Sequence, residues 1–160
     1  MLPDLLRHYN SSTRPAAFAA WAESLPRTKA AGSAFWSAAV AEWSGFDRID
    51  HYRMCKLFRR FRSSRPASLI ERLPDKIRIY RGQDAGDAFG LAWSTDRTIA
   101  EGFAEGHRGF VHDDPYVYEI TVSKEEVAFC CDNRGEAEIV LLRVTPDMVR
   151  EAIDGALSYD

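Results

Sequence analysis

Cysteine is scarce in this chain of 160 residues, and long hydrophobic runs are missing from it. The three cysteines are Cys55, Cys130 and Cys131, an odd number of which two are adjacent. This arrangement is a poor framework for disulfides and for a tetrahedral metal site, so we expect reduced thiols and no metal. Because no run of about eighteen apolar residues occurs, we expect no membrane-spanning segment.

Signal-peptide and Rossmann-type patterns are also lacking. The first residues show no basic region followed by an apolar core, so no signal peptide is expected. No Gly-rich fingerprint joins a strand to a helix, which argues against a Rossmann dinucleotide-binding domain. Hydrophobic residues make up 46% of the chain and charged residues 28%, values that are typical of a globular protein.

The formal net charge of −3 conceals an uneven distribution of charge. Up to Lys76 there are 13 Lys and Arg against 7 Asp and Glu, whereas from Ile77 onward there are 8 against 17. The basic part includes the run Arg53–Arg65, which contains six Lys or Arg. Such a run is usually the solvated face of a helix, and the alternative is a docking surface for an acidic protein or nucleic acid.

Hydrophobic periodicity divides the chain into a helical front and a strand-rich back. Apolar residues at helical spacing predict helices over 15–23, 33–43 and 51–61, with a further helical turn over 68–73. The large aromatic residues of this front are predicted to be core: Phe35, Trp36, Trp43, Phe58 and Phe61. Behind them, β-branched and aromatic runs predict strands over 77–81, 91–95, 116–122, 127–131 and 136–144, and helices over 96–104 and from 145.

This order of elements predicts an α+β fold. We expect a single compact domain over 1–160, in which a helical region, 1–73, precedes a strand-rich core, 74–160. The length is sufficient for one domain with a well-buried core.

Two motifs of the strand-rich part suggest that it binds a phosphate-bearing ligand. Arg81 and Gly82 end the first strand; an arginine binds a phosphate bidentately, and a glycine lets a flat ligand approach the backbone. Ser94 and Thr95 precede a helix N-terminus, where free backbone N–H groups attract anions. The alternatives are a surface arginine beside a turn and an ordinary helix cap, which is the explanation we adopt for Asp96.

A third motif places two carboxylates together. Glu136 and Glu138 are two residues apart in a predicted strand, so their side chains are expected on one face about 7 Å apart. Apolar residues follow them, which indicates that the strand enters a core. Two like charges at the edge of a core raise the pKa of one carboxyl group, which suits a general base. Solvated acids at a strand end are the alternative.

Together the three motifs resemble the arginine–serine–glutamate class of ADP-ribosyltransferases, the toxin-like enzymes that use NAD. The matching segments, within residues 77–142, are IRIYRG, GLAWSTDRTIAEGFA and RGEAEIVLL. The chain is also similar to small prophage-type proteins that carry these motifs after a helical front. The resemblance implies N-terminal helices packed against a strand-rich, split-sheet core that binds NAD as a substrate.

The resemblance implies roles for five NAD-binding residues. Arg81 would bind the NAD phosphates, and the backbone of Gly82 would meet the nicotinamide amide. Ser94 would steady the catalytic glutamate and contact the nicotinamide ribose, and Thr95, which follows it, is a further NAD-binding residue. Phe103 would pack near nicotinamide, and its alternative is an ordinary core position.

The resemblance also implies the catalytic pair. Glu138 would hold the ribose 2′-hydroxyl as the catalytic glutamate, and Glu136 would activate the acceptor. The chain departs from the family's pattern at Asp96, where a third hydroxyl residue is usual, and at Asn133, where many relatives have an aromatic residue. The expected activity is transfer of ADP-ribose from NAD to a macromolecule, chiefly a protein, with arginine as the favoured acceptor.

Two other functions are kept as alternatives. One is hydrolysis of NAD by an NAD glycohydrolase, and the other is a non-catalytic module of the same fold that binds protein or nucleic acid, the latter through Arg53–Arg65. The expected location is the cytoplasm of a bacterium, for a bacterial or phage-encoded protein, with delivery into another cell as the alternative.

Overall fold

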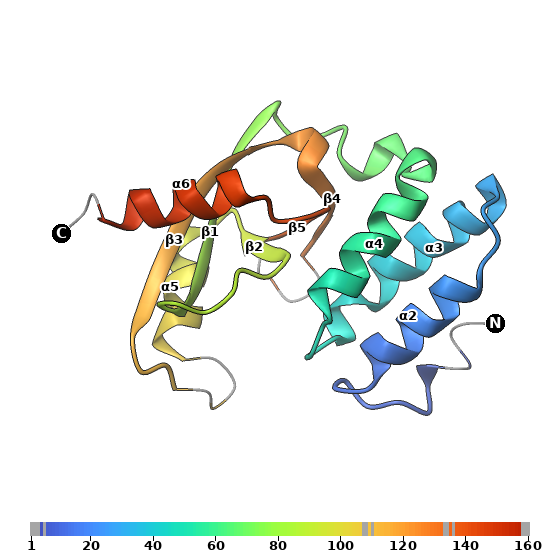
Figure 1. Cartoon of the computed structure of the whole chain (residues 1–160), viewed down its shortest axis with the longest axis horizontal. Helices are drawn as coiled ribbons and strands as arrows, with labels where there is room; N and C mark the ends of the chain where they lie inside the picture. The colour runs from blue at the N-terminus through green and yellow to red at the C-terminus, as the bar shows by residue number, and fades with distance from the viewer. Residues whose placement is uncertain are drawn as a thin grey trace. The chain divides into compact units, whose positions relative to one another are not determined.

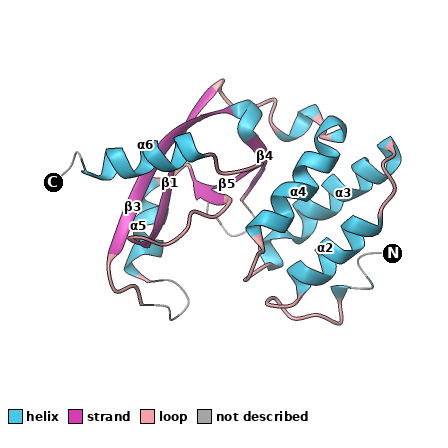
Figure 2. Ribbon diagram, viewed as in Figure 1, coloured by secondary structure: helices cyan, strands magenta, loops and turns pink. Residues whose placement is uncertain are grey.

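The protein is described by a computed structural model, which covers residues 4, 6–106, 109, 111–132, 135 and 137–157. The pattern of internal contacts divides the chain into two compact units, residues 1–69 and 70–160. The described part of the first unit is helical, and every described strand belongs to the second (Figures 1 and 2). The fold is therefore α+β, as the order of predicted elements indicates.

The structure gives bounds for three α-helices in the described residues of the first unit, and local sequence determines where each of them starts. Pro15 lies in the first turn of α2, Thr28 Oγ1 accepts a hydrogen bond from the backbone of α3, and Asp50 Oδ1 accepts one from the backbone of α4. The three predicted helices are confirmed, with α3 starting four residues earlier. The bounds are α2 (Arg14–Ser24), α3 (Lys29–Glu42) and α4 (His51–Phe61), with 3₁₀ turns at Trp43–Gly45, Arg62–Ser64 and Ala67–Leu69.

Aromatic rings fill the core of this unit. Trp36 stacks on Phe58 with ring centroids 5.4 Å apart and planes at 5°, and Phe35 stacks on Phe61 at 4.7 Å. The buried Trp36 indole also donates a hydrogen bond of 2.8 Å to the backbone oxygen of Phe61. These rings belong to α3 and α4, so the contacts join the two helices, and the prediction that the aromatic residues form a core is confirmed.

Replacing Trp36 by phenylalanine tests how much the contacts between α3 and α4 contribute to stability. Trp36→Phe would remove the indole hydrogen bond to the Phe61 carbonyl and open a small cavity, so the free energy of unfolding should fall by about 2–4 kcal/mol. Urea unfolding followed by circular dichroism measures it. The matched control is Trp21→Phe, at a half-buried ring whose indole bonds to no described residue. Equal losses in the two variants would contradict this role for the indole.

The second unit is built on one antiparallel sheet with the strand order β3-β1-β2-β5-β4. Strand β1 pairs with β3 along its whole length, from Lys76 opposite Ser123 to Asp84 opposite Pro115. By contrast, β1 pairs with β2 only at Tyr80 and Ser94. The strands are β1 (Lys76–Asp84), β2 (Ala92–Ser94), β3 (Pro115–Ser123), β4 (Val127–Cys131) and β5 (Glu138–Leu141).

Two helices cover opposite faces of this sheet. Helix α5 (Arg97–Glu105) packs against β1, while α6 (Pro146–Leu157) packs against β3, where Tyr116 Oη donates to the backbone oxygen of Ala156 (Figure 1). Asp96 caps α5 by accepting a hydrogen bond from Thr98 N, as predicted. Within the described ranges, no helix combines the length and apolar character that crossing a membrane requires.

The predicted strand over 136–144 is wrong in its bounds. The observed strand is Glu138–Leu141, because Ala137 has a positive φ of 45°, which is incompatible with an extended strand. Glu136 lies outside the described residues, so the predicted pairing of its side chain with Glu138 on one strand face is not described either.

Candidate functional site

The three motifs meet on three adjacent strands. Strand β2 lies between β1 and β5, and the register puts Tyr80 opposite Ser94 and Ser94 opposite Glu138. Residues that lie directly opposite each other in an antiparallel ladder point to the same face, so Ser94 and Glu138 are side-chain neighbours. Arg81 follows Tyr80 directly, so its side chain leaves β1 on the other face of the sheet, and the charge of Glu138 nevertheless acts on its guanidinium. Positions that are up to 57 residues apart in the chain are thereby gathered in the middle of the sheet.

The Arg81 side chain connects β1 to β2, which pair with each other at a single position. Its Nε donates to Gln83 Oε1 and its Nη1 to the backbone oxygen of Ala92, both at 2.6 Å. Burial of the guanidinium lowers the pKa of Arg81, and the carboxylates of Glu138 and Asp87 oppose that effect. The third nitrogen, Nη2, has no partner among the described residues. A poorly solvated cation with a spare donor is suited to bind an anion.

Gln83 is a site residue that the sequence analysis missed. It is 5% exposed, accepts from Arg81 and donates through Nε2 to the backbone oxygen of Asp87 at 2.8 Å. Gln83 therefore links the arginine to the loop that follows β1. The sequence does contain a signal for Gln83: it stands two residues after Arg81, and residues two apart on a strand share a face.

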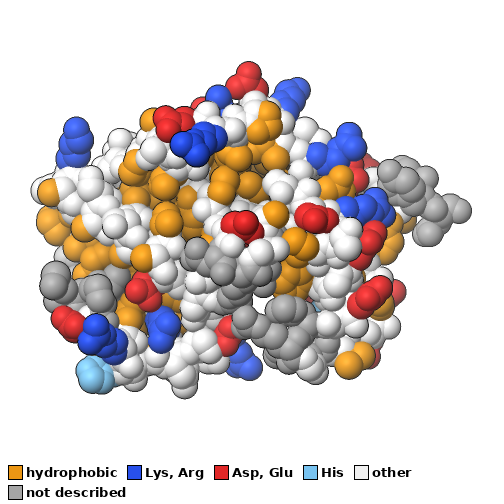
Figure 3. All heavy atoms as spheres, turned by 180° about the vertical axis from the view of Figure 1, so that it is seen from behind, with side chains coloured by type: hydrophobic (Ala, Val, Ile, Leu, Met, Phe, Trp, Pro, Cys, Tyr) orange, Lys and Arg blue, Asp and Glu red, His pale blue; other side chains and the backbone are white. Residues whose placement is uncertain are grey.

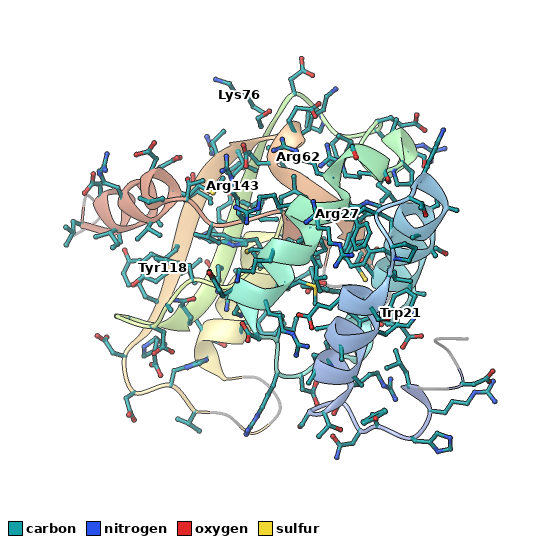
Figure 4. All side chains as sticks on the ribbon, turned by 45° about the vertical axis from the view of Figure 1, so that its right-hand side comes forward. Trp21, Arg27, Arg62, Lys76, Tyr118 and Arg143 are labelled. Carbon is teal, nitrogen blue, oxygen red and sulfur yellow. The ribbon has the colours of Figure 1, made fainter. Side chains whose placement is uncertain are left out.

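Aromatic side chains lie on the Arg81 side of the sheet. Tyr118, labelled in Figure 4, is opposite Arg81 in the register and makes an edge contact with Phe89 at 4.8 Å. Phe89 in turn stacks on Trp93 at 5.8 Å. The phenol of Tyr118 is 6% exposed, and burial raises its pKa. These rings place apolar surface on the Arg81 side of the sheet, and electrostatic interactions next to apolar surface are stronger than in water.

Ser94 is buried at the start of α5. It is 6% exposed, and its Oγ accepts a hydrogen bond of 3.0 Å from Asp96 N. Ser94 and Asp96 thus both cap backbone N–H groups at this helix start. Ser94 also stands opposite Glu138 in the ladder, so helix capping holds the hydroxyl on the face of the sheet that carries Glu138.

Thr95 and Asp132 hold the residue that precedes Glu138. The backbone oxygen of Ala137 accepts from Thr95 N at 3.0 Å, and Ala137 N donates to Asp132 Oδ1 at 3.0 Å. Gly135 N also donates to the backbone oxygen of Asp132. The hydroxyl of Thr95 points to Ala137 as well, at 3.4 Å. Asp132 is a second residue that the sequence analysis missed, since aspartate in a loop carries no specific signal.

The remaining predicted site residues lie on or near α5. A Cβ on Gly82 would collide with the Ala100 carbonyl and lie 2.6 Å from Ala104 N, so close packing of α5 explains this glycine. The predicted contact of its backbone with nicotinamide remains a prediction. Phe103 lies in the second half of α5 and is half-buried. Glu136 and Asn133 lie outside the described residues.

Comparisons with known proteins add no assignment. No family model matches the chain, and no curated protein or solved structure matches it. Among the described residues, no group of three His, Cys, Asp or Glu side chains is placed to hold a metal ion. The chemistry of the site must therefore be argued from its own geometry.

The contact between Gly82 and α5 gives a stability prediction. Gly82→Ala should lower the free energy of unfolding by about 3 kcal/mol or more, because helix backbone cannot yield as a side chain can. Gly102→Ala is the matched control: it lies within α5 with nothing near its Cβ, and it should raise the stability by about 0.5–1 kcal/mol. Thermal unfolding of both variants measures the difference, and a stable Gly82→Ala protein would contradict the packing.

The hydrogen bond from Ala137 to Asp132 gives a second prediction. In Asp132→Ala the Ala137 amide should exchange with deuterium about 5–10-fold faster, since one hydrogen bond of ordinary strength is lost. Asp132→Asn keeps an acceptor oxygen at the same place and should retain the protection. Amide exchange read by NMR distinguishes the two variants; equal exchange in both would show that Asp132 does not hold the loop.

Proposed function

We propose that the second unit binds NAD and transfers its ADP-ribose to a macromolecular acceptor, chiefly a protein. On this proposal the sheet is the split-sheet core of an ADP-ribosyltransferase, in which β1 and β2 diverge after their single pair. One observation carries the proposal: Arg81, Ser94 and Glu138, the three residues of the resemblance, lie on three adjacent strands. The charge of Glu138 also acts on the guanidinium of Arg81.

Arg81 supplies the phosphate-binding part of this function. Two of its nitrogens hold Gln83 and the Ala92 carbonyl, so the guanidinium is fixed before a ligand arrives. The remaining nitrogen and the positive charge face a diphosphate in surroundings that water screens poorly. Positioning of this kind contributes several kcal/mol to a reaction without any covalent step.

Glu138 supplies the catalytic carboxylate. When the bond between ribose and nicotinamide breaks, the electron pair leaves with nicotinamide and positive charge develops on the sugar. A carboxylate held beside that charge stabilises the transition state, and Ser94 and the pinned Ala137 keep Glu138 in place. The acceptor then bonds to the sugar carbon and loses a proton to a carboxylate, the role proposed for Glu136.

The test is labelling with radioactive NAD. The full chain, incubated with labelled NAD and a bacterial lysate, should transfer label to protein. Glu138→Gln removes the charge with little change in shape, so the rate should fall roughly 10²–10³-fold. Glu71→Gln, an exposed acid of the same unit, is the matched control and should label at the normal rate.

Each other outcome selects against the proposal. Label released only as free ADP-ribose would make the protein an NAD glycohydrolase. Label on nucleic acid would change the acceptor class, and full activity in Glu138→Gln would exclude this carboxylate from catalysis. Circular dichroism of both variants shows that a loss of rate is not a loss of fold.

Arg81→Lys tests the phosphate contact separately. Lysine keeps one positive charge but does not present the planar fork that reaches both Gln83 and the Ala92 carbonyl. We expect KM for NAD to rise by about tenfold or more, with a smaller change in kcat, because the lost interaction is with the bound substrate. Steady-state kinetics with varied NAD measures both constants. An unchanged KM would contradict a role for Arg81 in binding NAD.

A further inference from the structure

A half-open hollow lies in the helical unit, between the end of α2 and the outer side of α4. It encloses about 390 Å³ and is lined by Glu23, Arg27, Lys56, Leu57, Arg59 and Arg60. Four of these six residues carry a positive charge and one carries a negative charge. Every lining residue belongs to residues 1–69, so the hollow exists independently of the NAD site.

Two arginines around the hollow are occupied by structural contacts. Arg53 forms a bidentate ion pair with Glu23, at 2.6 and 2.7 Å, and these hydrogen bonds are the main reason that the pKa of Glu23 lies below its ordinary value. Arg60 donates to the backbone oxygens of Glu23 and Leu25 at the end of α2. The one acid of the hollow is therefore already neutralised, and Arg60 serves to cap a helix.

The other three cations remain available. Arg27, which follows α2 and is labelled in Figure 4, has no ion pair or hydrogen bond to a side chain in the part of the chain that the structure describes, and the same holds for Arg59. The Lys56 ammonium makes no ion pair with a described residue and lies over the ring of Tyr52, with Nζ 4.4 Å from the ring centroid. All three are exposed. On the face drawn in Figure 3, basic and acidic side chains lie near one another.

An exposed aromatic ring adjoins these cations. Tyr52 is 72% exposed, the largest such value among the aromatic residues of the described chain. Tyr52, Lys56 and Arg59 are spaced four and three residues apart on α4, so they form one stripe on the helix, about 10 Å long. The large apolar residues of α4 are buried on its other side, so the core does not account for Tyr52.

We infer that this hollow and the adjoining Tyr52 form a binding site for single-stranded nucleic acid. Guanidinium groups pair bidentately with phosphate oxygens and an ammonium group binds them as a point charge, so Arg27, Lys56 and Arg59 provide three phosphate contacts along a short backbone segment. The ring of Tyr52 offers a flat face on which a base stacks next to the charges. An acidic peptide needs the cations but has no use for the exposed ring, which is why nucleic acid fits the observations better.

The experiment measures binding of a labelled oligonucleotide. The full chain, without NAD, is titrated into fluorescein-labelled single-stranded RNA or DNA of about 12 nucleotides and followed by anisotropy. Three phosphate contacts predict a slope of about −2 for log K against log salt, a loss of roughly 20-fold between about 50 and 200 mM. Arg27→Ala/Lys56→Ala/Arg59→Ala should abolish most of that slope. Tyr52→Ala should weaken binding about 5-fold or more, while Tyr52→Phe should bind normally.

A charge-matched variant controls for net charge. Arg7→Ala/Lys29→Ala/Arg48→Ala removes three exposed cations from the same unit but none from the hollow, and it should bind almost as tightly as the natural chain. Equal losses in the two triple variants would overturn the site, as would tight binding by Tyr52→Ala. A labelled polyglutamate peptide that binds as tightly as the oligonucleotide would assign the hollow to acidic proteins instead. These outcomes leave NAD turnover unaffected, so they are independent of the proposed transferase.

Discussion

Strand β2 contributes only three residues to the sheet, yet both halves of the sheet depend on it. On one side it pairs with β1 at a single position, Tyr80 with Ser94, and on the other it pairs with β5 along its length. The ladder to β5 is extended at both ends, where Leu141 N donates to the Leu91 carbonyl and Thr95 N to the Ala137 carbonyl. Because β2 is so short, its register alone determines which residues of β1 and β5 come together.

Arg81 compensates for the short pairing between β1 and β2. Where further ladder bonds are missing, the guanidinium donates to the Ala92 carbonyl, and Gln83 satisfies a second nitrogen from the buried side. A buried cation is costly unless it is paired and hydrogen-bonded. The guanidinium makes two hydrogen bonds, and the negative charges of Glu138 and Asp87 favour its charged form. The Arg81 guanidinium connects the two strands, and its Nη2 is the donor that would bind an anion.

The charged residues are unevenly distributed between the two units and have different roles in them. Residues 1–69 hold 11 Lys and Arg against 5 Asp and Glu, and residues 70–160 hold 10 against 19. Several acids of the second unit accept hydrogen bonds from the backbone. Asp96 caps α5, Asp132 accepts from Ala137 N, and Asp84 accepts from Asp114 N. In the first unit, Arg53 and Arg60 tie α4 to the end of α2, while Lys56 and Arg59 on the outer stripe of α4 face solvent.

The sequence by itself determined the α+β order, the three front helices and the candidate residues Arg81, Ser94 and Glu138. These features depend on local chemistry: apolar spacing, the side chains at helix starts and the residues next to a strand end. Only the tertiary structure decided that the three candidates are neighbours, that β5 begins at Glu138 and that Gly82 is required by α5. Strand order depends on hydrogen bonds between distant segments. The positive φ of Ala137 depends on Asp132 and Thr95. No local pattern contains either kind of contact.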